Sequence, residues 1–334
     1  MKRKITKVLI LRFSSIGDIV LCSPVIRNIK KQTGAEVHFL TKKRFSDLVS
    51  HNPYIDKLWT FEKEVDEVLA ALKKEPYDLI IDLHKNLRSV RVRKSLGVKA
   101  ISFDKINFEK WLIVYLKINR LPNKHLVDRY MESMAASLPI LDDGLGMDFF
   151  YEISLEKKNA SLGLTQNYIV IVLGATYFTK RVPRHLIEQI LSDFPNEQIV
   201  LVGGDDVKEL GVSLAATHNH VRNLTGQLSL QGSAAVIDKS AVVISGDTGM
   251  MHIAAALQKP IVSIWGSTFL GFGMYPYYGV KNENKNISIE VKHLKCRPCS
   301  KIGKDHCPKS HFDCMMKIDY SQLKNAIDRQ LNLS

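Results

Sequence analysis

The stretch AVVISGDTGMMHIAAA at residues 241–256 places several polar groups where an apolar, strand-like run meets an alanine-rich helical segment. Thr248 offers a hydrogen-bond donor, and Gly246 and Gly249 let backbone amides approach a ligand at the positive end of the helix. Asp247 would repel a phosphate, so we expect it to accept hydrogen bonds from sugar hydroxyls. His252 lies in the first helical turn, where a lone histidine is more often structural, but the adjacent Asp-Thr-Gly favours a ligand contact. The segment predicts an anion site built largely from neutral groups.

Two more loops in the second half of the chain carry groups suited to a nucleotide. In Gly174–Pro183, Thr176 supplies a hydroxyl and Lys180 and Arg181 supply the cations that a diphosphate needs. A solvated basic loop is the alternative interpretation. Asp205 follows two glycines after the next strand-like run, where it either accepts hydrogen bonds from ribose hydroxyls or simply caps a helix.

The first polar loop of the chain is Arg12–Asp18. Ser14 and Ser15 are placed to bond anionic oxygens near a helix N-terminus, and Gly17 permits a tight turn. Asp18 is either a helix-capping residue, which its local pattern favours, or a carboxylate base. A single glycine excludes the dinucleotide-binding fingerprint G-x-G-x-x-G.

The elements that must position these loops alternate along the chain. Apolar strand-like runs alternate with helical patterns such as Ile19–Lys31 and Val65–Lys74, which predicts α/β architecture with two doubly wound parallel sheets. The strands are expected at 7–13, 36–40, 56–61, 78–83 and 99–103, then at 168–173, 198–202, 221–224, 241–245 and 260–265. In such sheets ligands bind at the carboxyl ends of the strands, so the βα loops should hold the chemistry.

Length and turn residues predict the domain organisation. A chain of 334 residues fits two domains of about 150 residues each. The turn-rich segment 139–146 suggests an N-terminal domain over residues 1–150 and a second over 160–315, closed by an amphipathic helix at 319–332.

Composition limits the compartment and the partners. The formal net charge of +13 predicts attraction to polyanions such as nucleic acid, nucleotide phosphates or an anionic membrane face, although a generally basic surface explains it equally well. No segment approaches the roughly 18 uncharged apolar residues of a membrane span, and the start of the chain does not resemble a secretion signal. We therefore expect a cytoplasmic protein.

Four of the five cysteines cluster near the C-terminus, at Cys296, Cys299, Cys307 and Cys314. In a reducing compartment, Cys-x-x-Cys indicates zinc more than a disulfide, although the spacing of the second pair is irregular for a zinc ribbon. We expect at most a structural zinc here, outside catalysis.

Together these motifs resemble glycosyltransferase family 9, the lipopolysaccharide heptosyltransferases. The matching segments are Ser14–Asp18, Tyr77–His84 with Asn86–Ser89, Lys180–Pro183 and Asp247–Ala255, in family order along the chain. Where the family usually has tryptophan in Lys-x-Trp-Pro, this chain has Val182, which puts local packing in doubt rather than the chemistry.

The resemblance implies a GT-B fold of two Rossmann-like domains and metal-independent, inverting transfer of a heptose from an ADP-sugar to a lipid-linked core oligosaccharide. It implies that Asp18 is the base, with Ser14, Ser15 and Gly17 beside the acceptor, and that Lys180 binds the diphosphate. Asp247, Thr248, Gly249 and His252 match the donor loop, and Asp205 loosely matches a ribose contact. His84, Lys85 and Arg88 would meet anionic groups of the acceptor, or merely form an exposed helix start.

Two other functions compete with transfer. A nucleotide-sugar epimerase shares the two-domain architecture but needs further acid and base groups around the sugar. A nucleic-acid-binding protein would use the basic surface, but the basic residues are scattered and few aromatic residues interleave with them. We therefore expect no nucleic-acid partner. The basic residues would instead help the protein reach its lipid-linked acceptor, through a peripheral contact with the anionic inner membrane.

Overall fold

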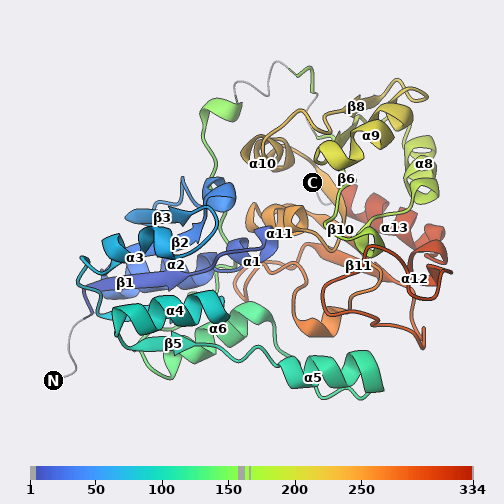
Figure 1. Ribbon diagram of the computed structural model, residues 1–334. Coiled ribbons are helices and arrows are strands. Elements are labelled where there is room, and N and C mark those ends of the chain that lie inside the picture. The colour runs from blue at the N-terminus through green and yellow to red at the C-terminus, as the bar shows by residue number, and fades with distance from the viewer. Residues whose placement is uncertain (1–4, 157–161, 165–166, 333–334) are drawn as a thin grey trace. The chain divides into compact units, whose positions relative to one another are not determined.

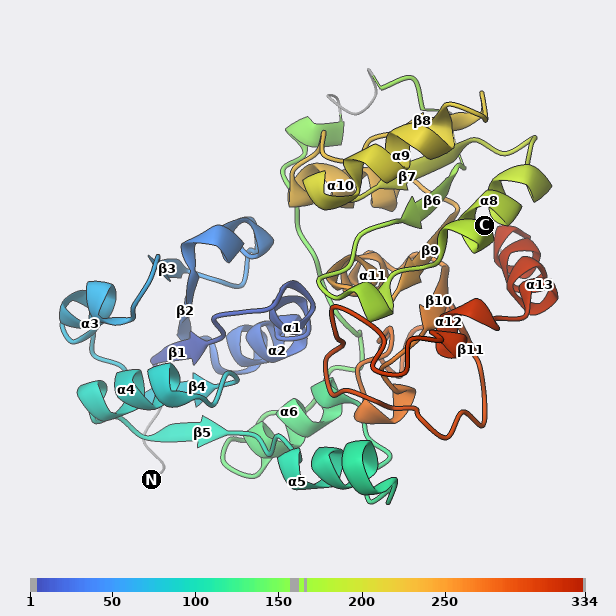
Figure 2. The ribbon, with the colours of Figure 1, turned by 45° about the vertical axis from the view of Figure 1, so that its right-hand side comes forward.

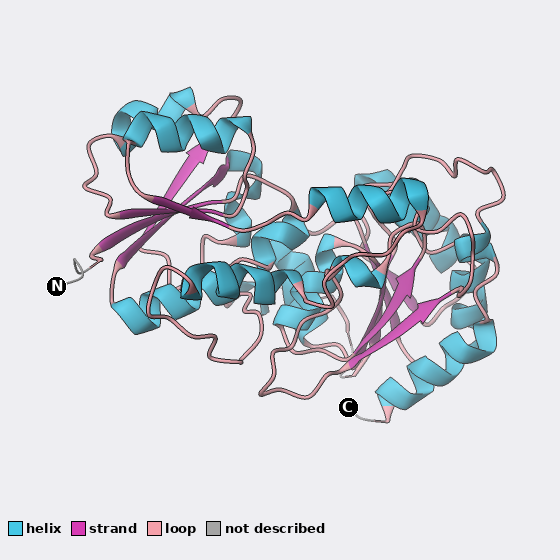
Figure 3. Cartoon of the chain, turned by 90° about the horizontal axis from the view of Figure 1, so that it is seen from below, coloured by secondary structure: helices cyan, strands magenta, loops and turns pink. Residues whose placement is uncertain are grey.

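The computed structural model describes residues 5–156, 162–164 and 167–332 (Figure 1). The chain divides into two compact units. The first contains residues 1–105, 124–150 and 279–282, and the second contains residues 106–123, 151–278 and 283–334. Each unit is built on one parallel sheet with helices along its faces (Figure 3).

The sheet of the first unit has five parallel strands in the order β3-β2-β1-β4-β5. Its strands are β1 (Lys7–Leu11), β2 (Glu36–Lys42), β3 (Lys57–Phe61), β4 (Leu79–Asp82) and β5 (Ala100–Ser102). Its helices are α1 (Ile16–Val20), α2 (Ser23–Thr33), α3 (Asp66–Leu72), α4 (Leu87–Leu96) and α6 (Leu126–Ala135), with a 3-10 turn η1 (Lys43–Leu48). Strands β1 and β4 are buried almost throughout, as strands covered on both faces must be.

The sheet of the second unit has six parallel strands in the order β11-β10-β9-β6-β7-β8. Its strands are β6 (Ile169–Val172), β7 (Ile199–Val202), β8 (Val221–Asn223), β9 (Val242–Gly246), β10 (Ile261–Trp265) and β11 (Asn286–Glu290). Its helices are α5 (Asn107–Trp111), α8 (Arg184–Asp193), α9 (Lys208–Ala215), α10 (Leu230–Asp238), α11 (Gly249–Ala256), α12 (Asp313–Met316) and α13 (Tyr320–Leu331). Short helical turns are η2 (Leu112–Leu116), η3 (Phe178–Lys180), η4 (Asp205–Val207) and η5 (Leu270–Phe272).

Apolar side chains hold the helices to this second sheet. Helices α8 and α13 lie on the same side of this sheet (Figure 2), where their leucines and isoleucines share one apolar core with residues of β6, β7, β9 and β10, and α13 contacts β9, β10 and β11. The closing helix α13 begins at Asp319, whose carboxylate accepts hydrogen bonds from the backbone amides of Ser321 and Gln322. Asp319 thus caps the closing helix that the sequence predicts at 319–332.

The predicted helix over residues 19–31 is two helices. Helix α1 ends at Val20, and α2 begins at Ser23 with Pro24 in its first turn, where proline needs no amide hydrogen bond. Helix α2 ends at Thr33 and is capped by Gly34, whose φ of +67° is the left-handed conformation that glycine adopts at little cost. The break follows from proline, which cannot continue a helix that began before it.

Strand β11 was missed by the sequence analysis, and the reason lies in its pattern. It is an edge strand paired only with β10, and asparagine and serine alternate with its isoleucines. A short, half-exposed strand lacks the continuous apolar run that marks the buried strands.

The turn-rich segment near residue 143 is fixed to the first unit by one buried cation. The Arg27 guanidinium, 1% exposed, donates to Asp143 at 2.6 and 2.7 Å, to Asp148 and to the Gly146 carbonyl. Residues 106–123, expected within an N-terminal domain over 1–150, instead belong to the second unit.

Candidate active site

In each sheet the order of strands reverses beside the first strand of that unit. Strand β1 lies between β2 and β4, and β6 lies between β7 and β9. In doubly wound sheets the crevice for ligands opens at this reversal, at the carboxyl ends of the strands. The loops that follow β1, β4, β6 and β9 are those that the sequence analysis singled out for their polar residues.

Asp18 is held by two neighbours at the end of β1. Its Oδ1 accepts an ion-paired hydrogen bond from Arg12 Nη2 at 2.7 Å, and its Oδ2 accepts from the Ser15 hydroxyl at 2.8 Å and the Ser15 amide at 3.2 Å. Ser15 is the N-cap of α1, so Asp18 completes a capping box. Asp18 therefore has the helix-capping role in the structure, and its side chain is still 20% exposed.

Arg12 is itself anchored by groups from other elements of the first unit. Its guanidinium donates to the carbonyls of Leu83 and Ser14 and to the Tyr130 hydroxyl. Burial alone would raise the pKa of Asp18, but Arg12 and then Ser15 outweigh it and hold that pKa below its ordinary value. Asp18 is consequently a carboxylate at neutral pH, pointing in a direction that Arg12 sets.

Replacing Arg12 by methionine is expected to lower the free energy of unfolding by about 3 kcal/mol, because it leaves the Asp18 charge without its partner. Urea unfolding followed by circular dichroism measures the change. Arg91→Met is the matched control: Arg91 also pairs with an aspartate, Asp66, but its side chain is 60% exposed, so we expect a loss below about 1 kcal/mol. Equal losses in the two variants would contradict the anchoring role of Arg12.

His84 lies beside this pair but is not a cation. Its ring packs against Phe13 with centroids 4.6 Å apart, and its Nδ1 is buried without a hydrogen-bond partner in the described structure. Burial, and then the positive charges of Arg12 and Lys105, lower the pKa of His84 to about 3. The expected contact of His84 with anionic acceptor groups must therefore come from a neutral imidazole.

Other predicted acceptor residues already have protein partners. Lys85 donates to the Phe103 carbonyl at 3.1 Å, and Arg88 pairs with Glu64 at 2.9 Å. The Ser14 carbonyl accepts a hydrogen bond from Arg12 Nε at 2.8 Å, and the contact of its hydroxyl with the acceptor stays a prediction. Gly17 is buried inside α1 and makes no tight turn, so the reason given for it was wrong.

At the reversal of the second sheet, Lys180 and Asp247 form an ion pair. Lys180 Nζ lies 2.8 Å from Asp247 Oδ2, and the same oxygen accepts a hydrogen bond from Thr268 Oγ1 at 2.8 Å. The pair joins the loop after β6 to the loop after β9. A cation and a carboxylate predicted separately from two motifs are thus in direct contact.

The start of α11 is organised by Thr248. As the N-cap, its hydroxyl accepts from the Met251 amide at 3.2 Å and also bonds the Ser245 hydroxyl at 3.0 Å. Gly249 is the first residue of the helix, partly exposed, and its amide lies at the positive helix end. His252 is buried, 2% exposed, within α11, and its ligand contact stays a prediction.

Gly246 allows the two loops to approach. A Cβ on Gly246 would lie 2.2 Å from the carbonyl oxygen of Lys180, which no side chain tolerates. The glycine was expected to let a ligand approach the backbone, whereas in the structure it lets the loop carrying Lys180 approach β9. It thereby allows the ion pair with Asp247 to form.

The remaining donor residues are more exposed. Thr176 is exposed on the loop after β6. Arg181 pairs with Asp206 at 2.5 Å, which places Asp206 rather than Asp205 beside the cation. Asp205 is an exposed residue at the start of η4, next to Gly226.

The cysteine segment packs on the same loops. The Thr179 hydroxyl accepts from the Lys304 amide at 2.9 Å and from the Ser267 hydroxyl at 2.8 Å, and Arg297 donates to the carbonyls of Gly266 and Thr268. The segment therefore supports the loops that carry Lys180 and Thr268.

The four clustered cysteines are free thiols, and burial raises the pKa of Cys299 and Cys314. Among residues 5–156, 162–164 and 167–332, no three His, Cys, Asp or Glu side chains are grouped to hold a metal ion. This geometry is not a preformed ligand set, so the structural zinc stays a prediction that metal analysis of the purified protein tests.

Several residues of these sites escaped the sequence analysis. Arg12 pairs with Asp18, and the Tyr130 hydroxyl accepts from Arg12. Burial, followed by the charge of Arg12, lowers the pKa of Lys105, while Asp18 acts in the opposite direction. Thr268 and Thr179 support the donor loops. Arg12 stands directly at the end of a strand in the motif that contains Asp18, which was the available signal; Tyr130 and Thr268 are distant in sequence and gave none.

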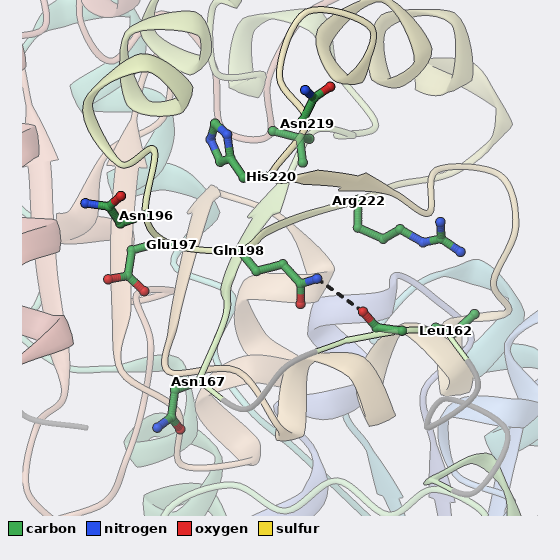
Figure 4. A pocket seen from close by; sticks show the side chains of 10 residues that line it. Leu162, Asn167, Asn196, Glu197, Gln198, Asn219, His220 and Arg222 are labelled. Carbon is green, nitrogen blue, oxygen red and sulfur yellow. Dashed lines mark hydrogen bonds between the residues drawn. The ribbon is translucent and has the colours of Figure 1, made fainter.

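A separate cavity of about 690 Å³ lies at the amino-terminal ends of β6, β7 and β8 in the second sheet (Figure 4). It is lined by residues that precede β6, β7 and β8, among them Asn167, Gln198 and His220. Because ligands of this architecture bind at the carboxyl ends, this cavity is not the candidate active site.

Comparison with known proteins shows the family to which the chain is similar over most of its length. The model of glycosyltransferase family 9 (heptosyltransferase) matches residues 66–307, which is well over half of the chain. Lipopolysaccharide heptosyltransferase 1 of Campylobacter coli is 25% identical over 289 residues, covering 78% of this chain and 84% of that protein. Lipopolysaccharide heptosyltransferase 3 of Escherichia coli K12 is 23% identical over 276 residues, covering 75% and 80%.

Solved structures share the fold. A family 9 glycosyltransferase from Veillonella parvula superposes with a TM-score of 0.80 at 18% identity, covering 100% of this chain and 99% of that one. The E. coli heptosyltransferase WaaC with ADP has a TM-score of 0.69 at 19% identity, covering 97% and 100%. These likenesses confirm the predicted α/β fold of the GT-B class.

Proposed function

Because the chain belongs to glycosyltransferase family 9, the heptosyltransferases, we propose that it transfers a heptose from ADP-heptose to a lipopolysaccharide inner-core acceptor. The names of its relatives and the ADP bound to one structural neighbour support this choice of acceptor and donor. The observation that carries the proposal is the pair of polar sites at the two sheet reversals, one with a carboxylate and one with an ammonium group. The family match favours transfer over the epimerase and nucleic-acid-binding alternatives.

In this proposal Asp18 is the general base. The acceptor hydroxyl attacks the anomeric carbon, its proton passes to Asp18, and the bond from that carbon to the diphosphate oxygen breaks with its electron pair leaving on ADP. A carboxylate has about four lone-pair positions, and Arg12 with the two Ser15 donors uses three. The acceptor hydroxyl would use the fourth, with inversion at carbon because attack and departure are on opposite faces.

The donor site stabilises the departing diphosphate with fixed positive groups. Lys180 supplies an ammonium, and the amides at the start of α11 supply the helix dipole. Asp247 holds Lys180 at 2.8 Å, so the donor shares or takes over that ammonium on binding. We propose that these groups take the place of a metal ion, and that Thr176, Arg181 and Asp205 contact the nucleotide.

The acceptor is anchored in a membrane, so we propose that the protein works at the cytoplasmic face of the inner membrane. In the described part of the chain, no helix has both the length and the apolar character needed to cross a bilayer. Contact with the membrane would then be peripheral, and the net charge of +13 favours anionic lipids.

Thermal unfolding with added nucleotides tests the donor class. ADP is expected to raise the midpoint of thermal unfolding more than UDP does, because the ligand that binds more tightly stabilises the folded state more at the same concentration. A ligand at about 100 times its dissociation constant adds about 2.7 kcal/mol to the stability of the folded state. Incubation with ADP-heptose and a core acceptor should then release ADP and extend the acceptor by one heptose. Selective stabilisation by UDP, or no product with ADP-heptose, would contradict the proposal.

A further inference from the structure

A row of apolar side chains lies exposed on the helix formed by α5 and η2. The exposed fractions are 64% for Phe108, 43% for Trp111 and 67% for Tyr115. Spacings of three and four residues put these rings on one helix face, and they stack in sequence with centroids 6.4 and 5.8 Å apart. Leu116 and Ile118, 53% and 46% exposed, extend the row.

The opposite face of the same helix is firmly packed. Ile113 and Val114 are buried against Phe272, and Lys110 lies 6.0 Å from the centre of the Phe272 ring. Lys117 Nζ donates to the carbonyls of Cys296 and Pro298 at 3.3 and 2.7 Å. The exposed row is therefore the outer face of an amphipathic helix fixed to its unit, rather than a loose loop.

The cysteine segment adds positive charge beside this row. Lys301 Nζ donates to the Asn107 carbonyl at 3.1 Å, and the adjacent Ile302 is 58% exposed. Residues 291–304 contain no acidic residue, and Lys292, Lys295 and Lys304 are exposed. Lys292 lines a pocket together with Ile113 and Lys117 of this helix. We name the outer row and its neighbours the aromatic-basic surface: Phe108, Trp111, Tyr115, Leu116, Ile118, Lys292, Lys301 and Ile302.

We propose that the aromatic-basic surface docks on an anionic lipid bilayer. Large exposed apolar patches on a soluble unit mark an interaction site, and aromatic rings bordered by lysines suit the membrane interface. There the rings enter the boundary of headgroups and acyl chains while the ammonium groups meet anionic headgroups. The positive charge argues against a second copy of this basic chain as the occupant, since like charges would meet.

If the protein has the proposed function, docking through this surface brings its acceptor close to the donor site. Phe269, packed against the same helix, follows directly after Thr268, the partner of Asp247 in the donor site. The aromatic-basic surface therefore belongs to the carboxyl-end side of the second sheet, where the donor binds. A bilayer held there brings a lipid-anchored acceptor to the side of the unit that carries the donor.

Vesicle binding without donor or acceptor tests the proposal. The wild-type protein should co-sediment with phosphatidylglycerol–phosphatidylethanolamine vesicles, more weakly with phosphatidylcholine vesicles and less at high salt. The triple variant Phe108→Ser, Trp111→Ser, Tyr115→Ser should lose roughly tenfold or more in partitioning. The double variant Ile153→Ser, Val212→Ser, which removes side chains 75% and 56% exposed elsewhere in the second unit, is the matched control and should bind like wild type.

Tryptophan emission gives a second readout. Trp265 is 1% exposed, so in a Trp59→Phe background the emission responsive to vesicles comes from Trp111 and should shift to the blue on binding. Stabilisation by ADP in the triple variant shows that it is folded. Unchanged vesicle binding by the triple variant, no binding by the wild type, or self-association that covers Trp111 would each overturn the proposal.

Transfer to a deacylated, water-soluble acceptor separates this proposal from the proposed function. The triple variant should turn over that acceptor as wild type does, because no membrane is involved. If wild type fails with the soluble acceptor but binds vesicles through Trp111, the proposed function is wrong and the aromatic-basic surface stands. If wild type transfers normally but the triple variant binds vesicles unchanged, only the surface assignment is wrong.

Discussion

The variant Asp18→Asn is expected to lose transfer by a factor of about 100 to 10,000 in kcat while binding ADP nearly as wild type does. Asparagine keeps an oxygen to accept from Ser15 but removes the basic carboxylate. Because Arg12 and Ser15 hold the pKa of Asp18 below its ordinary value, the carboxylate is charged throughout the neutral range. The loss should therefore be the same from about pH 6 to pH 8, as measured by initial rates of ADP release with saturating acceptor.

Alanine at position 18 is the wrong test on its own, because it leaves the buried Arg12 charge without its partner and lowers stability as well. Aspartate and asparagine differ little in size, so the asparagine variant separates chemistry from folding. Asp78→Asn is a matched control, since Asp78 accepts hydrogen bonds from Thr6 at the other end of the first sheet. Near-normal turnover of Asp18→Asn with a verified acceptor would show that another group takes the proton.

The variant Lys180→Ala is expected to weaken ADP binding by about tenfold to a hundredfold, because a hydrogen bond to a charged group contributes about 1.5–3 kcal/mol. The loss should grow with the number of phosphates, so adenosine should bind the two proteins alike. Isothermal titration with ADP, AMP and adenosine measures this series.

Its control takes the ion pair with Asp247 into account. Lys180→Ala also leaves Asp247 facing the diphosphate without its cation, so part of the loss is repulsion. The double variant Lys180→Ala, Asp247→Asn removes that repulsion and should recover part of the affinity. Lys324 is a half-exposed lysine on α13 near Asp193, so Lys324→Ala should bind ADP unchanged. Wild-type affinity in Lys180→Ala would refute the diphosphate contact.

The buried strands were readable from sequence because both faces of a parallel sheet are covered. Runs such as Ile169–Val172 are wholly apolar and stand out, whereas edge strand β11 alternates with polar residues and was missed. Predicted helix boundaries were wrong where a single residue interrupts the helical pattern, as Pro24 does between α1 and α2. The loops bearing Asp18, Lys180 and Asp247 were found because glycines and polar residues interrupt apolar runs.

What the sequence by itself determined is the alternation of elements and the loops that follow each strand, since both depend on neighbours within one turn or one strand. Tertiary structure alone decided which groups these loops bring together. Arg12 meets Tyr130 across 118 positions and Asp247 meets Thr268 across 21, and no local pattern contains either contact. Asp18 and His84 show the consequence: Arg12 outweighs burial and keeps the pKa of Asp18 low enough for a carboxylate, whereas burial, followed by the charge of Arg12, keeps His84 neutral.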